Sequence, residues 1–348
     1  MKLTFSIGCR NMARLSEEFL LAWSSLSGND SMPGWQAISL ASAGPVEVQA
    51  GRRSPTNAEA ILFCFPTAKL VRTEKLPEGQ GFLIERADSA NYGELTLALT
   101  RKEAGSSELF TAMVCDVVGA IDDVATTGVD ESKLLRVLIG RVIAWKQFMS
   151  RGANPLSPEA ELGLAGELTF MVTLLDSGVP VEEVLRSWVG PDDAPQDFLL
   201  GDGAVEVKAT MSSSGFPVKI GSLEQLDDSL TSPLFLAAVR FSREEGGLTL
   251  PEMIAETELR LGGEPGAVNF LRERLMVSGY FEGHSSHYIR KFESKEKRVF
   301  SVSEGFPRLT PGVVPAGVTR ALYEINLDHA GDFLSDLDAA LKQLGVTG

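Results

Sequence analysis

The stretch of sequence that decides the fold is residues 196–208, which read QDFLLGDGAVEVK. An Asp-Gly pair between apolar runs is a strong signal for a two-residue turn, because such turns need positive φ angles. We predict a β-hairpin over 196–210 with its turn at Asp202-Gly203, which pairs Asp197 with Lys208. Side chains alternate along a strand, so Asp197, Glu206 and Lys208 then project from one face. A three-residue turn starting one position earlier would move Asp197 to the other face, so the hypothesis depends on the turn.

Two carboxylates a few ångströms apart on one face repel each other unless water or a cation screens them. Mg²⁺ prefers hard oxygen ligands and uses one or two protein carboxylates, which leaves its other positions to water and substrate phosphates. A neighbouring lysine can orient or help deprotonate an attacking water and offset the charge of a phosphoryl transition state. Asp197, Glu206 and Lys208 therefore fit a Mg²⁺ site for phosphoester hydrolysis, in which Mn²⁺ can substitute. Taken alone, the three residues also fit an exposed, charged strand face.

A helix is predicted immediately upstream of this hairpin. Ser157 is typical of an N-cap and Pro158 of a first helical position, and the helix should run to about Asp176. Glu167 lies on its apolar stripe, which consists of Leu164, Leu168, Met171 and Leu175. A carboxylate that faces the core is costly unless it is paired or bound to a metal. We expect Glu167 to point at the sheet and complete an acidic pocket.

A further helix is expected over 223–230, and Gln225 has two possible roles there. Ser222-x-x-Gln225 has the spacing of a capping box, in which Gln225 would bond back to the Ser222 backbone N–H. Gln225 could instead belong to the active site. The residues leave both readings open.

Four short segments together resemble the PD-(D/E)XK nuclease superfamily, and more closely the PD-(D/E)XK motif proteins of bacterial restriction and anti-phage defence loci. These segments are Gly163-Leu164-Ala165-Gly166-Glu167-Leu168, Gln196-Asp197-Phe198, Val205-Glu206-Val207-Lys208 and Ser222-Leu223-Glu224-Gln225-Leu226. The resemblance implies an α/β fold with a restriction-endonuclease-like αβββαβ core, a mixed sheet flanked by helices. One departure is that Gln196, not proline, precedes Asp197.

The resemblance also implies roles for residues and for partners. Asp197 and Glu206 would be metal ligands, Glu167 an accessory acidic ligand on the first core helix, Lys208 the catalytic lysine and Gln225 an active-site residue. The implied activity is Mg²⁺-dependent hydrolysis of DNA in restriction or anti-phage defence. An ATPase or helicase, or a methyltransferase, from the same locus is the partner to expect.

The rest of the chain predicts a second domain. With 348 residues the chain is long enough for about two. Short apolar runs separated by turn residues predict an antiparallel sheet in the first third, followed by two helices; these segments are 45–49, 60–65, 81–86, 95–100, 108–124 and 131–149. We expect a β-rich N-terminal domain over 1–125 and the nuclease core with a C-terminal extension over 126–348. Residues 151–155, Arg-Gly-Ala-Asn-Pro, form a second candidate boundary.

Composition limits the other functions. A net charge of −15 counts against a stand-alone nucleic-acid binder. The candidate phosphate contacts form one basic run, which consists of Arg290, Lys291, Lys295, Lys297 and Arg298, although such runs are usually solvated faces. The three cysteines are far apart, which favours buried reduced thiols and a cytoplasmic protein. No apolar run reaches the roughly 18 residues of a membrane span, and we expect no membrane association.

Two alternatives from other classes remain. One is a catalytically silent nuclease fold that binds DNA or scaffolds a defence complex, although the intact Glu206 and Lys208 argue against it. The other is a structural interaction protein, which the acidic balance favours. The sequence has no phosphate-binding P-loop, so any nucleotide-driven motion would come from another protein.

Overall fold

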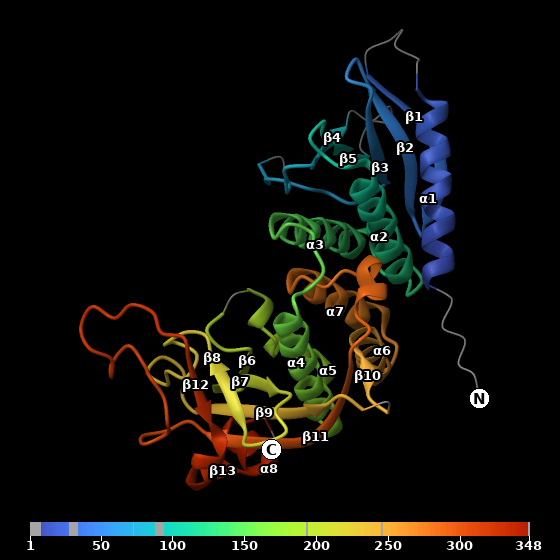
Figure 1. Cartoon of the computed structure of the whole chain (residues 1–348). Helices are drawn as coiled ribbons and strands as arrows, with labels where there is room; N and C mark the ends of the chain where they lie inside the picture. The colour runs from blue at the N-terminus through green and yellow to red at the C-terminus, as the bar shows by residue number, and fades with distance from the viewer. Residues whose placement is uncertain are drawn as a thin grey trace. The chain divides into compact units, whose positions relative to one another are not determined.

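The computed structural model describes residues 8–27, 34–71, 73–87, 94–192, 194–244 and 246–346 (Figure 1). The chain divides into two compact units, Met1–Ala153 and Asn154–Gly348. This division falls at the break predicted over 151–155, and the boundary expected at residue 125 is too early. The reason is that the helix over 131–150 packs against the preceding helix, where Arg141 donates two hydrogen bonds to Asp116.

The first unit is built on a five-stranded antiparallel sheet in the order β1-β2-β3-β5-β4. Trp23 is buried and donates a hydrogen bond from Nε1 to the Ala60 backbone oxygen, which ties the first helix to this sheet. The sequence analysis anticipated neither that helix nor β1. The elements are α1 (Gly8–Ser25), β1 (Gly34–Ala43), β2 (Val46–Ser54), β3 (Ala58–Phe65), β4 (Phe82–Ala87), β5 (Leu95–Arg101), α2 (Ser107–Ala125) and α3 (Glu131–Ser150).

The second unit has a mixed sheet in the order β10-β11-β9-β7-β6, with β13 paired to β11. Only the β7–β9 pair is parallel within this described sheet. The strands are β6 (Phe198–Leu200), β7 (Gly203–Thr210), β9 (Leu234–Ser242), β10 (Leu248–Thr249), β11 (Lys291–Ser301) and β13 (Leu334–Ser335). The predicted mixed α/β architecture, preceded by a β-rich unit, is confirmed.

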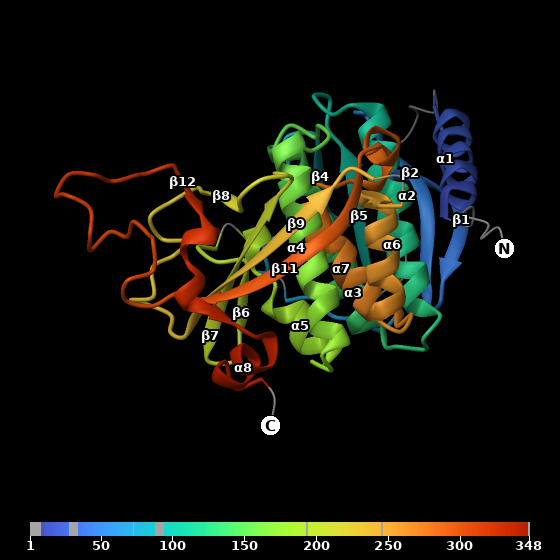
Figure 2. The ribbon, with the colours of Figure 1, turned by 60° about the horizontal axis from the view of Figure 1, so that its bottom comes forward.

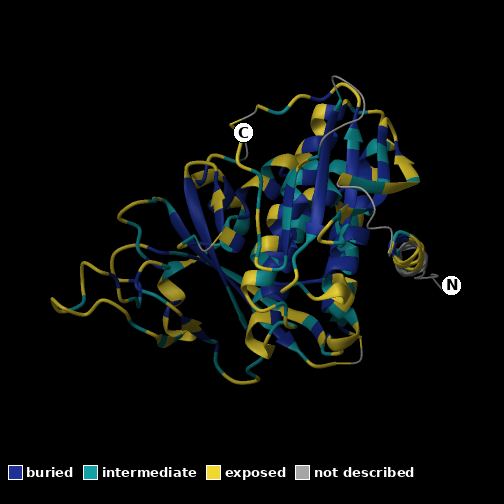
Figure 3. Cartoon of the chain, turned by 90° about the horizontal axis from the view of Figure 1, so that it is seen from above, coloured by how far each residue is buried: buried dark blue, intermediate teal, exposed yellow. Residues whose placement is uncertain are grey.

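Helices cover one face of this mixed sheet and a small two-stranded sheet covers the other. This antiparallel pair consists of β8 (Pro217–Ile220) and β12 (Tyr323–Asn326) and contributes Val218 and Ile220 to an apolar cluster. The helices are α4 (Pro158–Asp176), α5 (Val181–Ser187), α6 (Leu250–Arg260) and α7 (Pro265–Val277), and a last helix, α8 (Leu337–Gln343), follows β13. In Figure 2 the strands β9 and β11 cross α4, and Figure 3 shows buried residues concentrated where strands and helices face each other.

The first core helix begins as predicted. The Ser157 hydroxyl accepts a hydrogen bond from the Ala160 backbone N–H at 3.2 Å, and Pro158 occupies the first helical turn. A Cβ added at Gly166 would lie 2.9 Å from the Ala209 Cβ on β7. Gly166 therefore allows α4 to approach β7 closely, which carries Glu167 toward the edge of the sheet.

The hairpin forms, but its turn lies one residue earlier than predicted. Leu200 pairs with Gly203, so Gly201-Asp202 is the turn. Gly201 has a φ of +58°, and a Cβ there would lie 1.9 Å from the Leu344 carbonyl oxygen. Glycine is needed at this position because the end of α8 packs against the turn. The shift keeps the same side chains on each face, and the register extended by one residue places Asp197 opposite Glu206.

The helix predicted over 223–230 is wrong. The described chain there consists of bends and turns. Side chains take the backbone N–H groups that a helix would organise: Ser222 Oγ accepts from Glu224 N at 3.3 Å, and Asp227 Oδ1 accepts from Ser229 N at 3.1 Å. Such local side-chain bonds compete with helix formation.

Candidate active site

Four charged side chains meet at the open edge of β7, beyond the short strand β6. Glu206 on β7 is 1% exposed, whereas Glu167 on α4 and Asp197 before β6 are half-buried. Lys208, two residues after Glu206, places its Nζ 2.6 Å from Glu206 Oε1. The structure thus brings together the residues that the hairpin and helix patterns selected.

Each carboxylate faces a different donor. Asp197 Oδ2 accepts the Val207 backbone N–H at 2.8 Å, a group that β6 is too short to pair. Glu206 Oε1 lies 2.6 Å from Lys208 Nζ, and the backbone of Asp197 also hydrogen-bonds to this carboxylate. A carboxylate has about four lone-pair sites, so these two contacts leave Glu206 with oxygen capacity for a metal ion.

Trp188 and Gly190 enclose the third carboxylate and were missed by the sequence analysis. The buried Trp188 donates from Nε1 to Glu167 Oε2 at 2.7 Å. A Cβ on Gly190 would lie 2.8 Å from Asp197 Oδ1 and 3.4 Å from Glu167 Oε2, so only glycine leaves this space. No spacing rule could have found either residue, because a loop and a helix meet here through tertiary packing.

Gln225 fulfils parts of both of its expected roles. Its Oε1 accepts from Lys208 Nζ at 3.0 Å and from the Gly221 backbone N–H at 2.7 Å. The second bond resembles a cap, although no helix follows it. Gln196, which replaces the expected proline, donates from Nε2 to the Glu224 backbone oxygen at 2.9 Å. The two glutamines hold the 221–228 segment against Asp197 and Lys208.

Burial is the main cause of the raised pKa values of the three carboxylates. Burial, followed by the charge of Asp197, raises the pKa of Glu206 to about 8. Burial also raises the pKa of Asp197, and it raises the pKa of Glu167 well above its usual range. Burial alone would lower the pKa of Lys208, but the three carboxylates outweigh it and raise that pKa. Lys208 is therefore an ammonium ion that only partly compensates three acids.

The donor set fits a hard divalent cation. Among the described residues no three acidic, histidine or cysteine side chains already stand at the mutual distances of a formed metal site. Trp188, the Val207 N–H and Lys208 each contact a different carboxylate of the cluster. Oxygen-only ligands at a buried, negatively charged edge suit Mg²⁺ or Mn²⁺.

The predicted basic run lies on and before β11, where acidic neighbours and other groups of this chain engage most of it. Arg290 pairs with the buried Glu161 at 2.6 Å, and Lys297 donates to Thr173 Oγ1 at 2.9 Å. Lys291 is exposed at the start of the strand. The remaining two form the pairs Lys295–Glu244, Lys295–Glu293, Arg298–Glu296 and Arg298–Asp328. The role of this run in DNA binding stays a prediction.

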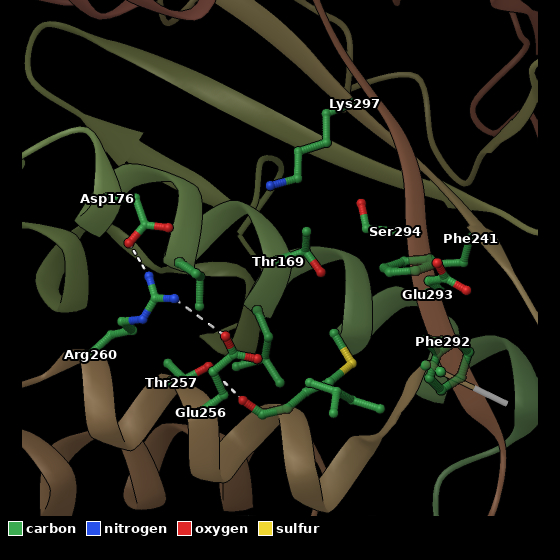
Figure 4. Close-up of a pocket in the computed structure, with 16 residues that line it drawn as sticks. Thr169, Asp176, Phe241, Glu256, Thr257, Arg260, Phe292, Glu293, Ser294 and Lys297 are labelled. Atoms are coloured by element: carbon green, nitrogen blue, oxygen red, sulfur yellow. Dashed lines mark hydrogen bonds and ion pairs between the residues drawn. The ribbon is translucent and has the colours of Figure 1, made fainter. Parts of the chain in front are cut away.

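A separate pocket of about 320 Å³ is lined by residues of α4, α6, β9 and β11 (Figure 4). Arg260 pairs with Asp176 and Glu256 at its rim, and the structure records no member of the acidic cluster in its lining. Arg260 thus pairs with two of the carboxylates that line this pocket.

A mixed α/β fold with an Asp, a Glu-x-Lys strand and a helix glutamate at one sheet edge is the arrangement of a PD-(D/E)XK protein. Residues 20–328 match the family described as "Putative PD-(D/E)XK family member" (DUF4420), so the chain belongs to this nuclease-type family. No curated protein and no solved structure matches the chain. No helix among the described residues is long and apolar enough to cross a membrane.

Proposed function

We propose that this protein is a Mg²⁺-dependent endonuclease that hydrolyses DNA phosphodiester bonds. The observation that carries the proposal is the buried, under-compensated cluster of Glu167, Asp197 and Glu206 beside Lys208. Burying several like charges without a counter-ion is unfavourable, and a divalent cation removes that cost. The family match supports nuclease chemistry at this site.

The side chains have separable tasks. Asp197 and Glu206, with Glu167 beside them, would hold the Mg²⁺, which when bound supplies a Lewis acid and lowers the pKa of water. Trp188 donates a hydrogen bond that favours the ionised form of Glu167. Gln225 holds the Lys208 ammonium at the mouth of the cluster. Because its pKa is raised, Lys208 acts as a cation and hydrogen-bond donor that orients water and stabilises charge on the scissile phosphate.

The proposed setting is restriction or anti-phage defence, in which a motor or a modification enzyme delivers or marks the DNA. Its support is the resemblance of the four motif segments to proteins of such loci. The strong negative charge of the chain also favours delivery by a partner, because an acidic protein does not accumulate on DNA by electrostatics alone.

The function is tested by separating metal binding from catalysis. Asp197→Ala removes a ligand oxygen, so both Mn²⁺ binding in calorimetry and plasmid cleavage should be lost. Lys208→Ala should keep Mn²⁺ binding and lower cleavage by about 10²–10³-fold or more. Cleavage is measured with and without candidate partners.

Asp202→Ala is the matched control, because Asp202 lies in the turn of the same hairpin but outside the cluster. It should leave both readouts unchanged. Equal cleavage by wild type and Lys208→Ala would show that Glu206-Val207-Lys208 is an ordinary strand segment and would refute the proposal.

A further inference from the structure

Residues 309–323 form a closed loop that projects from the second unit and returns at β12 (Figures 1 and 2). We call it the 309–323 loop. The Tyr323 hydroxyl accepts the Leu309 N–H at 3.0 Å and lies 3.3 Å from the Leu309 carbonyl oxygen, which fastens the two ends together. Inside the loop, Val313 N donates to Thr310 O and Val318 N to Pro315 O. These bonds define a built loop with close ends, the kind that often carries function.

The root of this loop lies at the candidate active site. Tyr323 pairs with Ile220 in the two-stranded sheet of β8 and β12. The residue after Ile220, Gly221, donates its backbone N–H to the Gln225 side chain that also holds Lys208. Burial raises the pKa of Tyr323, and the Leu309 backbone and the charges of Arg308 and Lys208 oppose the rise.

A second attachment reaches the same segment. Arg308, directly before the loop, donates to the Leu226 backbone oxygen at 2.7 Å and pairs with Asp228 at 3.0 Å. One end of the loop is therefore bonded to the 221–228 segment, which contacts Lys208, and the other end pairs with Ile220, directly before that segment.

The projecting part of the loop is apolar, exposed and free of carboxylates. Val313 is 68% exposed, Val318 42% and Leu322 78%. Arg320 is exposed and forms no ion pair with any described residue. From residue 305 to 323 there is no Asp or Glu, although the chain has 47 acidic residues. Gathered apolar side chains mark an interaction surface, and the missing carboxylates remove repulsion toward phosphate.

We propose that the 309–323 loop is the part of this protein that grips substrate DNA beside the cleaved bond. Arg320 contacts a backbone phosphate, and Val313, Val318 and Leu322 pack against sugars or base edges in a groove, as apolar side chains of groove-binding proteins do. The proposal rests on the proposed nuclease function. DNA is favoured over a protein partner because the loop is anchored to the segment that holds Lys208, where the substrate must arrive.

The test measures anisotropy of a fluorescein-labelled DNA duplex with full-length protein in Mg²⁺, on a Lys208→Ala background that slows cleavage. Arg320→Glu should weaken binding about tenfold and reduce the salt slope by about one phosphate's worth, ~0.9. The double variant Val313→Ser, Val318→Ser should weaken binding with an unchanged slope. Cleavage of plasmid by the same changes in an otherwise wild-type chain is measured in parallel.

The matched controls are Arg136→Glu on α3 and Leu259→Ser on α6, which make the same chemical changes at exposed positions elsewhere. They should leave affinity and slope unchanged, and thermal melts of all variants show whether each is folded. If the folded loop variants bind DNA as tightly as the wild type, this proposal is overturned. If those variants also cleave DNA, the proposed nuclease function stands. DNA binding that depends on the loop without any cleavage supports the loop and refutes the nuclease. A wild type that neither binds nor cleaves DNA overturns both.

Discussion

Strands β7 and β11 belong to the same sheet, but their charged side chains lie in opposite environments. On β7 the carboxylate of Glu206 is 1% exposed, two further acids lie beside it, and Lys208 is the cation paired with it. On β11 the basic side chains Lys295 and Arg298 remain at the surface and pair with acidic neighbours. Burying charge without full compensation is costly, which favours binding of a cation, whereas paired surface charge contributes little energy.

The largest effect is expected from a substitution at Glu206. Glu206→Gln keeps the shape of the side chain but removes one charge and one ligand oxygen. We expect cleavage to fall by about 10²-fold or more, since the change removes both a metal ligand and the ion-pair partner of Lys208. Plasmid cleavage beside calorimetric Mn²⁺ titration measures it. Near-normal cleavage by this variant would place the chemistry elsewhere.

The pH dependence of the free energy of unfolding tests whether Glu206 is a buried acid with a raised pKa. The folded pKa of Glu206, about 8, lies above its usual value of 4.5. The unfolded chain therefore releases a proton that the folded chain retains between these values. Stability of the metal-free protein should fall as pH rises from about 4.5 to 8, by up to about 1.4 kcal/mol per pH unit from this group.

Urea unfolding across this pH range measures the slope. In Glu206→Gln the side chain cannot ionise, so the slope of stability against pH should be smaller than in the wild type. Relative to the wild type, the metal-free variant should therefore be more stable at pH 8 than at pH 5. Saturating Mg²⁺ should flatten the wild-type curve by favouring the ionised acids. A wild-type slope that neither change reduces would contradict the assignment of Glu206 as a buried acid without full compensation.

Trp188→Phe tests how the half-buried Glu167 is held. Loss of a hydrogen bond to a charged group, worth about 1.5 kcal/mol, should weaken Mn²⁺ affinity roughly tenfold. The matched control is Trp145→Phe in the first unit, because Trp145 also donates from Nε1 to a carboxylate, Asp116, at 2.7 Å. Both changes can lower stability, but only Trp188→Phe should change the metal affinity. Equal affinities in the two variants would leave Trp188 with a packing role alone.

The smallest effect is expected on β11. Lys295→Ala removes a surface cation that pairs with Glu244 and Glu293, and stability should change by less than about 1 kcal/mol. We expect DNA affinity to change less than with Arg320→Glu, because the acidic partners already screen Lys295. Urea unfolding and duplex anisotropy provide the two readouts. If Lys295→Ala weakens DNA binding more than Arg320→Glu does, the basic run over 290–298 is the main DNA-binding surface.

The sequence predicted the convergence of most side chains of the candidate active site because the rules that place them are local. Alternation along a strand placed Asp197, Glu206 and Lys208 on one face. This prediction holds although the turn lies one residue earlier than predicted. Moving a two-residue turn by one position changes each cross-strand partner by two residues, so the faces are preserved. The capping signals at Ser157 and Pro158 likewise fixed the start of α4.

Tertiary structure decided everything that depends on close approach between distant segments. The position of the turn follows from the Leu344 carbonyl beside Gly201, and the enclosure of Glu167 follows from Trp188. The segment after Ser222 lacks a helix because side chains and neighbouring segments bind its backbone instead. Periodicity describes which face of an element a residue occupies, and it carries no information about which element that face will meet.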